Sequence, residues 1–181
     1  MKPLLGPDDV PTRLVEPNVL QRVGIALTVT PNGKIQGCAV EKSSGNSKLD
    51  SYTCEVAARR AKFKPPTHID GAAAYLIYRA DINWWLGDGY PPSTQPGGDL
   101  YLTVTALPPK VASPAIVRLM LEVGADGSLS NCAAEDSKYD SALVKTGCEQ
   151  LLLTYRPTPA RAADGAAVAS VQSATVVFQT N

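Results

Sequence analysis

The chain contains one pattern twice, and the two copies lie 94 positions apart. In residues 25–38 and again in residues 119–132, an alternating apolar run is followed by a glycine turn, a second alternating run and a cysteine. A second cysteine follows 16 positions later in each copy. The equivalent positions are Gly33 and Gly127, Cys38 and Cys132, and Cys54 and Cys148. A repeat of this length is too long for a solenoid unit and is about the size of a small domain, so it predicts a tandem duplication.

Composition narrows the class of protein. The 181 residues can hold two domains of roughly 100 residues each. Apolar residues make up 44% and charged residues 19%, as in a globular chain, and the net charge of zero argues against non-specific binding to nucleic acid or anionic lipid. No apolar stretch reaches the ~20 residues of a membrane-spanning helix, and the N-terminus has no apolar region of signal-peptide length. We therefore infer either a cytosolic protein or a chain from which a targeting segment has been removed.

The four cysteines favour two disulfides, Cys38–Cys54 and Cys132–Cys148. Nothing about folding requires the same pair at the same spacing twice unless its members meet. Four buried free thiols are an alternative. A zinc site is harder to assemble, because no pair has Cys-x-x-Cys spacing and His68 is the only histidine. Closing a loop of about 15 residues would stabilise a domain by roughly 3 kcal/mol, and disulfides persist in oxidising compartments, which indicates the periplasm or the outside of the cell.

Local patterns predict the order strand, turn, strand, helix, strand in the first copy. Residues 23–30 and 35–41 alternate as strands do, and the Asn-Gly between them predicts a type I′ hairpin turn. Residues 49–61 show helical spacing of apolar positions and end in basic residues, which suit a helix C-terminus. A last strand is expected at residues 73–84, and one short element near residues 15–20.

The second copy predicts the same order. Its expected elements are strands at residues 116–123 and 129–134, a helix at residues 141–153, a last strand at residues 167–178 and an additional strand at residues 100–105. We therefore predict an α+β fold of two tandem ββαβ domains, each an antiparallel sheet with one helix packed on a face. Residues 1–88 would form the first domain, residues 89–99 a Pro/Gly linker and residues 100–181 the second. The last strand of each domain is expected to leave its outer edge open.

Short motifs follow one another in a definite order along the first copy. They are Ser43-Ser44-Gly45, Leu49-Asp50, Arg59-Arg60-Ala61, Phe63-Lys64-Pro65-Pro66, Asp70-Gly71 and a final strand that ends at Trp84. This ordered set resembles the C-terminal domain of TonB-type energy transducers, whose cysteine-bearing branch has a pair placed like Cys38 and Cys54. The resemblance implies the ββαβ fold and a role in binding outer-membrane transporters.

The second copy is similar to the same family but more divergent. Tyr155-Arg156-Pro157 stands in for Phe63-Lys64-Pro65 with a shift of two positions, and Glu135-Asp136-Ser137 replaces the Ser-Ser-Gly motif. Asp164-Gly165 and Phe178 match Asp70-Gly71 and Trp84. The family's Tyr-Pro segment, membrane anchor and proline-rich spacer have no counterpart in the sequence.

Three features are candidates for binding. The first is the last strand of the first copy, with Tyr75, Leu76, Ile77, Tyr78 and Arg79. These residues could be no more than the two faces of a packed strand, or a peptide could add to the strand's free edge by backbone hydrogen bonds. In the resembled family this strand receives the receptor's peptide.

The other two features are an aromatic pair and a basic patch. In Trp84-Trp85, adjacent side chains point to opposite faces, so one is expected in the core and the other against the second copy or a ligand. Arg59, Arg60 and Lys62 form either a solvated helix end or a docking patch for an acidic partner.

No catalytic motif, phosphate-binding loop or metal-ligand set occurs, and His68 is expected in an exposed loop, so we predict a non-enzymatic protein without cofactor or metal. The leading hypothesis is a periplasmic module that binds the N-terminal peptide of an outer-membrane TonB-dependent transporter by strand addition. An inner-membrane proton-driven motor would be a partner only if an anchor exists upstream; no nucleic acid is expected, and a dimer through sheet edges is possible. One alternative is a scaffold whose two sheets pair with each other, and another is a cell-envelope small-ligand binder that uses Trp85 and Tyr90.

Overall fold

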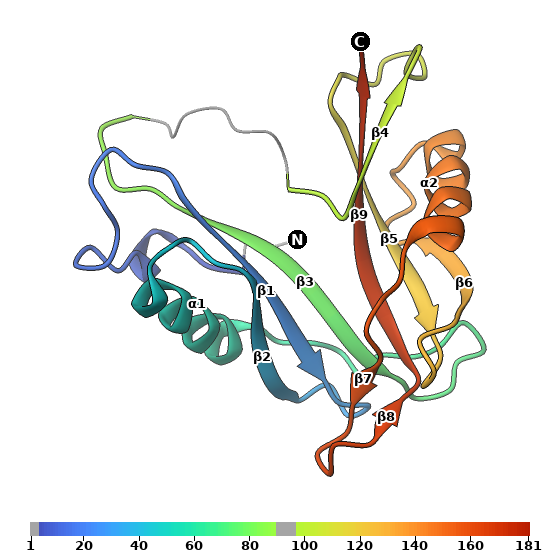
Figure 1. The fold of residues 1–181 in the computed structure, drawn as a ribbon, viewed down its shortest axis with the longest axis horizontal. Helices are drawn as coiled ribbons and strands as arrows, with labels where there is room; N and C mark the ends of the chain where they lie inside the picture. The colour runs from blue at the N-terminus through green and yellow to red at the C-terminus, as the bar shows by residue number, and fades with distance from the viewer. Residues whose placement is uncertain (1–3, 90–96) are drawn as a thin grey trace.

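Each half of the chain folds as two strands, a helix and a final strand around its own core (Figure 1). The computed structural model describes residues 4–89, the first half, and residues 97–181, the second half. The first half contains η1 (Pro7–Asp9), β1 (Gln21–Val29), β2 (Ile35–Lys42), α1 (Ser47–Arg60) and β3 (Tyr75–Trp84). The second contains β4 (Leu100–Val104), β5 (Ala115–Val123), β6 (Leu129–Ala134), α2 (Ser141–Thr154), β7 (Ala160–Arg161), β8 (Ala167–Val168) and β9 (Ser170–Thr180). The predicted α+β class is confirmed, whereas residues 15–20 form no helix or strand.

Within the described ranges, seven strands form one continuous mixed sheet, not two separate antiparallel sheets, and β7 and β8 form a small sheet of their own. The strand order is β2-β1-β3-β9-β5-β6, and β4 lies beside β9. The halves join where Tyr75–Ile77 of β3 pairs in parallel with residues 170–172 of β9. The prediction of an open edge on both last strands is therefore wrong at this point. The physical reason is burial, because Leu76, Ile77 and Val171 are each at most 9% exposed in the paired arrangement.

The two helices cover opposite faces of this sheet. Residues that pair across neighbouring strands lie on the same face, and Leu76 pairs with Val171. Leu76 shares its face with the β1 residues that pack under α1. The β9 residues that pack under α2, including Ala174 and Phe178, belong to the alternate set and therefore lie on the other face.

A separate hydrophobic core lies under each helix. The first core contains Val23, Ile25, Leu27, Leu49, Val56 and Trp84, and the second contains Val117, Leu119, Leu121, Leu143, Leu151 and Phe178. Cys38–Cys54 joins β2 to α1, and Cys132–Cys148 joins β6 to α2, with a Cα–Cα distance of 5.6 Å in both. The predicted disulfides are confirmed, and the alternatives of free thiols and a zinc site are wrong.

The hairpin turns share one geometry, which is not the predicted type I′. In the first, Gly33 N donates to the Thr30 carbonyl and Thr30 N to the Lys34 carbonyl, and of the turn residues only Gly33 has positive φ (80°). This is a three-residue loop that closes on a glycine in the left-handed region, whereas type I′ needs two such residues. The same pair of backbone bonds recurs at residues 68–72, 124–128 and 162–166.

A small hairpin of each half packs against the sheet of the other. In the first half, Ile69 N donates to Glu122 Oε1 at 2.8 Å, and His68 Nδ1 lies 3.5 Å from the same oxygen. His68 is therefore half-buried, not an exposed loop residue as expected. In the second half, Ala160 of the β7–β8 hairpin packs on Ile77, and Arg161 O accepts from Gln36 Nε2 at 3.0 Å. The sequence patterns did not predict these hairpins.

Candidate functional site

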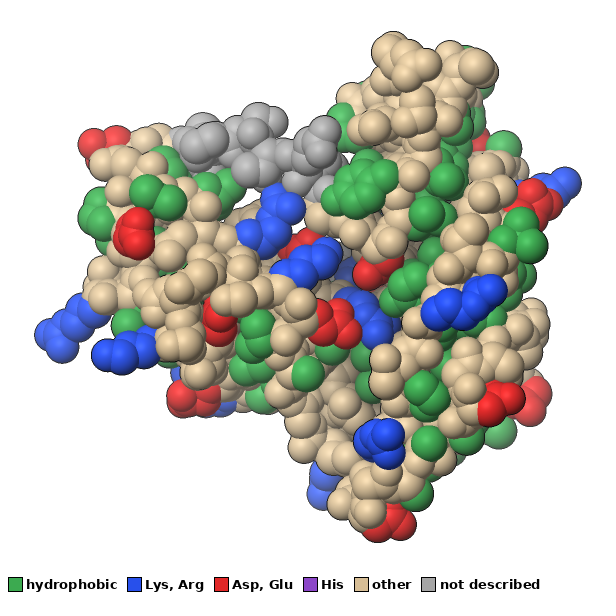
Figure 2. All heavy atoms as spheres, in the orientation of Figure 1, with side chains coloured by type: hydrophobic (Ala, Val, Ile, Leu, Met, Phe, Trp, Pro, Cys, Tyr) green, Lys and Arg blue, Asp and Glu red, His purple; other side chains and the backbone are tan. Residues whose placement is uncertain are grey.

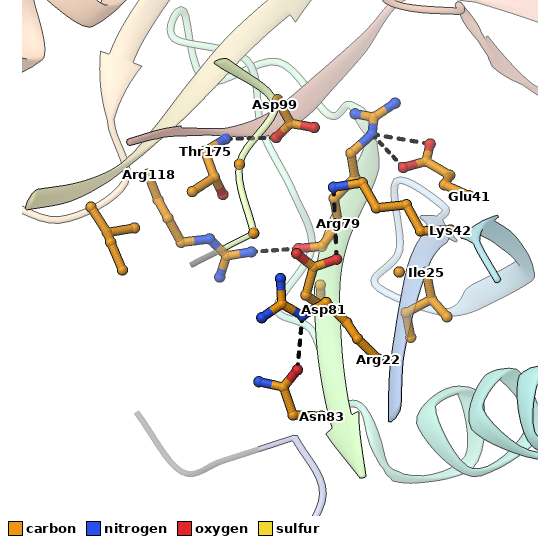
Figure 3. Close-up of a pocket in the computed structure, with 15 residues that line it drawn as sticks. Arg22, Ile25, Glu41, Lys42, Arg79, Asp81, Asn83, Asp99, Arg118 and Thr175 are labelled. Carbon is orange, nitrogen blue, oxygen red and sulfur yellow. Dashed lines mark hydrogen bonds and ion pairs between the residues drawn. The ribbon is translucent and has the colours of Figure 1, made fainter. Parts of the chain in front are cut away.

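A hollow lies where β3 and β9 separate. After Ile77 the two strands no longer pair, and side chains connect them instead. Arg79 N donates to Ser173 Oγ at 2.8 Å, and the Arg118 guanidinium donates to the Arg79 carbonyl and, at 2.8 Å, to Tyr78 Oη. Beyond these contacts the halves diverge around a cavity of about 490 Å³ (Figure 3). We call this cavity the charged cavity.

The β9 side of the charged cavity is closed by backbone pairing. Asp99 Oδ2 accepts from Thr175 N at 2.7 Å, and Asp99 N donates to the Thr175 carbonyl at 2.8 Å (Figure 3). From Val176 onward β4 pairs with β9. This side of the hollow therefore offers no open β9 edge to a partner.

On the β3 side of the charged cavity, no described strand covers the edge, and Gly97 lies next to the Asp81 carboxylate. The backbone groups of Arg79 point toward β9, and successive residues of a strand alternate, so the N–H and C=O groups of Asp81 and Asn83 face the same way. The register between β1 and β3 is continuous through Trp84, which preserves this alternation. In the described part of the chain, no strand pairs with β3 on this side beyond Ile77. We call the segment from Ala80 to Trp84 the open β3 edge.

Ion pairs and polar contacts line the charged cavity. Glu41 lies 3.0 Å from Arg79 Nε, Asp81 lies 3.9 Å from Lys42 Nζ, and Asn83 Oδ1 accepts from Arg22 Nε at 3.0 Å. Figure 2 shows basic and acidic side chains next to one another in the hollow between the halves. Charged side chains of both signs thus line the cavity without a strong excess of either, and Ile25 and Ile116 add apolar surface.

Arg118 stays charged in spite of its burial. Burial lowers its pKa, but Tyr78 and Glu135 raise it, and the pKa lies above its ordinary value. Its position is equivalent to Gly24 in the first half, and no sequence motif marked it. A comparison of the two copies could have drawn attention to Arg118, because this charged residue stands where the first copy has a glycine.

The predicted strand residues all have partners within the chain. Tyr75, Leu76 and Ile77 pair with β9, Tyr78 bonds to Arg118, and Arg79 bonds to Glu41. Their role in partner binding stays a prediction. The sequence analysis placed the candidate site on β3 but did not single out Asp81 and Asn83, with which no described strand pairs on this side.

Two residues of the basic patch, Arg59 and Arg60, form ion pairs within their own half. Arg60 Nη2 lies 2.8 Å from Asp9 Oδ1, and Arg59 Nη1 lies 3.3 Å from Glu55 Oε1. Hydrogen bonds from Gly6 N and Arg60 hold the pKa of Asp9 below its ordinary value. Lys62 follows α1, and docking of a partner on the patch stays a prediction.

The two tryptophans have different surroundings. Trp84 is 2% exposed and donates from Nε1 to Thr53 Oγ1 at 2.8 Å, as expected for the core member of the pair. Trp85 lies beside the N-terminal segment of its own half, and its buried Nε1 has no hydrogen-bond partner among the residues described. Tyr90, the other residue of the predicted small-ligand cleft, lies outside the described residues, as do residues 90–96 of the predicted linker.

Within residues 4–89 and 97–181, no group of His, Cys, Asp or Glu is arranged to hold a metal ion. No helix in these ranges is long and apolar enough to cross a membrane.

Part of the first half is similar to a known protein family. Residues 18–86 match the family described as Gram-negative bacterial TonB protein C-terminal. The matched range contains the whole ββαβ unit and the open β3 edge, and it does not extend into the second half. The match supports a TonB-type periplasmic domain that interacts with proteins. No curated protein and no solved structure matches the chain significantly.

Proposed function

We propose that the protein is a periplasmic, non-enzymatic module that captures an extended segment of a partner protein on the open β3 edge. The observation that carries the proposal is that, among the described residues, no strand pairs with the backbone groups of Asp81 and Asn83 that face away from β1, within the range that matches the TonB C-terminal family. A peptide strand added there would form about four backbone hydrogen bonds with these two residues. Two disulfides suit the oxidising periplasm.

The partner that fits this proposal is the N-terminal segment of an outer-membrane TonB-dependent transporter. In the fuller form of the proposal, the chain is part of an energy transducer that passes force to the transporter, with an inner-membrane proton-driven motor as a second partner. Several backbone hydrogen bonds loaded together are a plausible way to transmit such force. The second half would be a divergent tandem copy that pairs with β3 as far as Ile77 and leaves the rest of that edge accessible to a peptide.

A matched pair of variants tests capture on this edge. Asn83→Pro removes a backbone N–H that faces the open side, where a proline is tolerated, while Asn83→Ala keeps the N–H. Both variants lose the contact with Arg22. We expect Asn83→Pro to weaken binding of transporter N-terminal peptides about tenfold, measured by titration calorimetry, and Asn83→Ala to change it less than about twofold. Equal affinities of the two variants, or no binding to the unaltered protein, would contradict the proposal.

A scaffold is the second candidate function, and the continuous sheet favours it. Pairing of Tyr75–Ile77 with β9 already uses part of the edge that a peptide would need. In a scaffold the two halves would serve to hold each other, and partners would bind elsewhere, for example on the outer strands β2 and β6 that end the sheet. A scaffold predicts binding that is unaffected by Asn83→Pro.

A further inference from the structure

A second cavity lies on the opposite face of the open β3 edge. It measures about 470 Å³ and lies between β3 and the N-terminal segment. Its apolar wall contains Leu4, Leu5, Val10, Ile82 and Trp85. We call it the leucine cavity.

The leucine cavity and the charged cavity flank the same stretch of backbone. Ala80, Asp81 and Asn83 line both of them. The side chains of Asp81 and Asn83 are engaged with Lys42 and Arg22 on the charged side. Ile82 and Trp84 belong to the face under α1, where the leucine cavity lies. The open β3 edge thus lies between one cavity lined mainly by apolar side chains and another lined by several charged ones.

A strand paired with this edge would place its side chains alternately in the two cavities. Successive side chains of an extended chain point to opposite faces of the sheet, whether it pairs parallel or antiparallel. Over the length of the open β3 edge, about two or three side chains would enter each cavity.

The two cavities favour opposite kinds of side chain. In the charged cavity, an apolar side chain would displace water from the ion pairs of Arg79 with Glu41 and of Lys42 with Asp81 without offering them a partner. In the leucine cavity, an apolar side chain would bury its surface against Leu4, Leu5 and Val10, whereas a polar one would lose its hydration.

We propose that the peptide captured by this protein has strictly alternating apolar and polar side chains, with the apolar ones in the leucine cavity and the polar ones in the charged cavity. This inference rests on the proposed capture at the open β3 edge and adds a rule of recognition to it. The rule requires the N-terminal segment of this chain and the second half, because residues of these two segments complete the cavities.

Three labelled peptides of eight residues test the rule with the full chain. One alternates threonine and valine, one has the same composition in two blocks, and one alternates threonine and serine. We expect the alternating threonine–valine peptide to bind about tenfold more tightly than either of the others in fluorescence anisotropy. Equal affinity of the alternating and the blocked peptide would overturn the rule.

A variant of the leucine cavity supplies the matched control. Leu5→Asp should weaken binding of the alternating peptide about tenfold, whereas Val19→Asp should not, because Val19 is 44% exposed and does not line the cavity. Circular dichroism melting checks that both variants fold, and Leu5→Ser replaces Leu5→Asp if the charge prevents folding. Equal effects of the two substitutions would overturn the rule. Asn83→Pro could weaken binding while neither the order of residues in the peptide nor the substitution of Leu5 changes the affinity, and in that case only the rule of alternation is wrong. If Asn83→Pro also leaves the affinity unchanged, the proposed capture on this edge is wrong as well.

Discussion

At the scale of single residues, Asp50 explains why the Ser-Ser-Gly motif precedes α1. Ser43 Oγ and Ser44 Oγ donate to the Asp50 carboxylate at 2.6 and 2.7 Å, and Ser44 N donates to it at 2.9 Å. Burial raises the pKa of Asp50, but these hydrogen bonds outweigh it and hold the pKa below its ordinary value. The motif therefore supplies the donors that let a charged carboxylate lie in the first turn of the helix.

Replacement of this carboxylate should change the stability and its pH dependence. The unfolded pKa is about 3.9 and the folded value lies lower, so the charged group stabilises the fold above this range and the contribution is lost as pH falls through the folded pKa. Asp50→Asn should lower the free energy of unfolding at pH 7 by about 1–3 kcal/mol in urea titrations. It should also flatten the loss of stability below about pH 4.

The matched control for this prediction is Asp8→Asn, at an exposed position of the N-terminal segment. We expect the control to leave the free energy of unfolding within about 0.5 kcal/mol of the unaltered protein. An Asp50→Asn variant as stable as Asp8→Asn at pH 7 would show that the hydrogen bonds to the carboxylate contribute nothing net.

At the scale of elements, each disulfide fixes one helix to the edge strand beside it. Both close a loop of the same length, with a sequence separation of 16, and they belong to separate cores. The double variants Cys38→Ser/Cys54→Ser and Cys132→Ser/Cys148→Ser should each lower the free energy of unfolding by roughly 3 kcal/mol, and the quadruple variant should lose their sum. Urea unfolding under non-reducing conditions measures all three.

Reduction of the unaltered protein checks the same prediction independently. With reductant, the unaltered chain should unfold at the same urea concentration as the quadruple variant, and the variant itself should not respond to reductant. A response of the quadruple variant would mean that the reductant acts on something other than these two bonds.

Local elements were predictable from the sequence, and the contacts between halves were not. The predicted helix at residues 49–61 is α1 at Ser47–Arg60, because its apolar spacing and basic end act within one segment. The alternation of apolar and polar residues within β3 or β9 does not indicate which strand lies beside either one, because the pairing of strands depends on residues far apart in the sequence. For the same reason, the apolar Leu76 and Ile77 indicated burial but did not indicate that β9 buries them.

At the scale of the whole molecule, the halves hold each other through reciprocal contacts. Each half places a small hairpin on the other's sheet, through Glu122 in one direction and Arg161 in the other. The direct strand pairing is short, so side chains must secure the rest of the junction. Arg118 is the central one, since it reaches from β5 across β9 to Tyr78 and to the backbone of Arg79.

Loss of Arg118 should therefore loosen the junction while both cores remain intact. Arg118→Met keeps the aliphatic length of the side chain but leaves Tyr78 Oη and the Arg79 carbonyl without their donor, which should cost about 1–3 kcal/mol in the free energy of unfolding. Hydrogen exchange should accelerate at the backbone amides of residues 75–79 and not in α1 or α2. Arg156→Met is the matched control, because the exposed Arg156 donates to the nearby carbonyls of Leu153 and Tyr155 and, among the described residues, to no group of the first half. If the two variants exchange alike at residues 75–79, Arg118 does not hold the halves together, and the short β3–β9 pairing with the two hairpins must be sufficient.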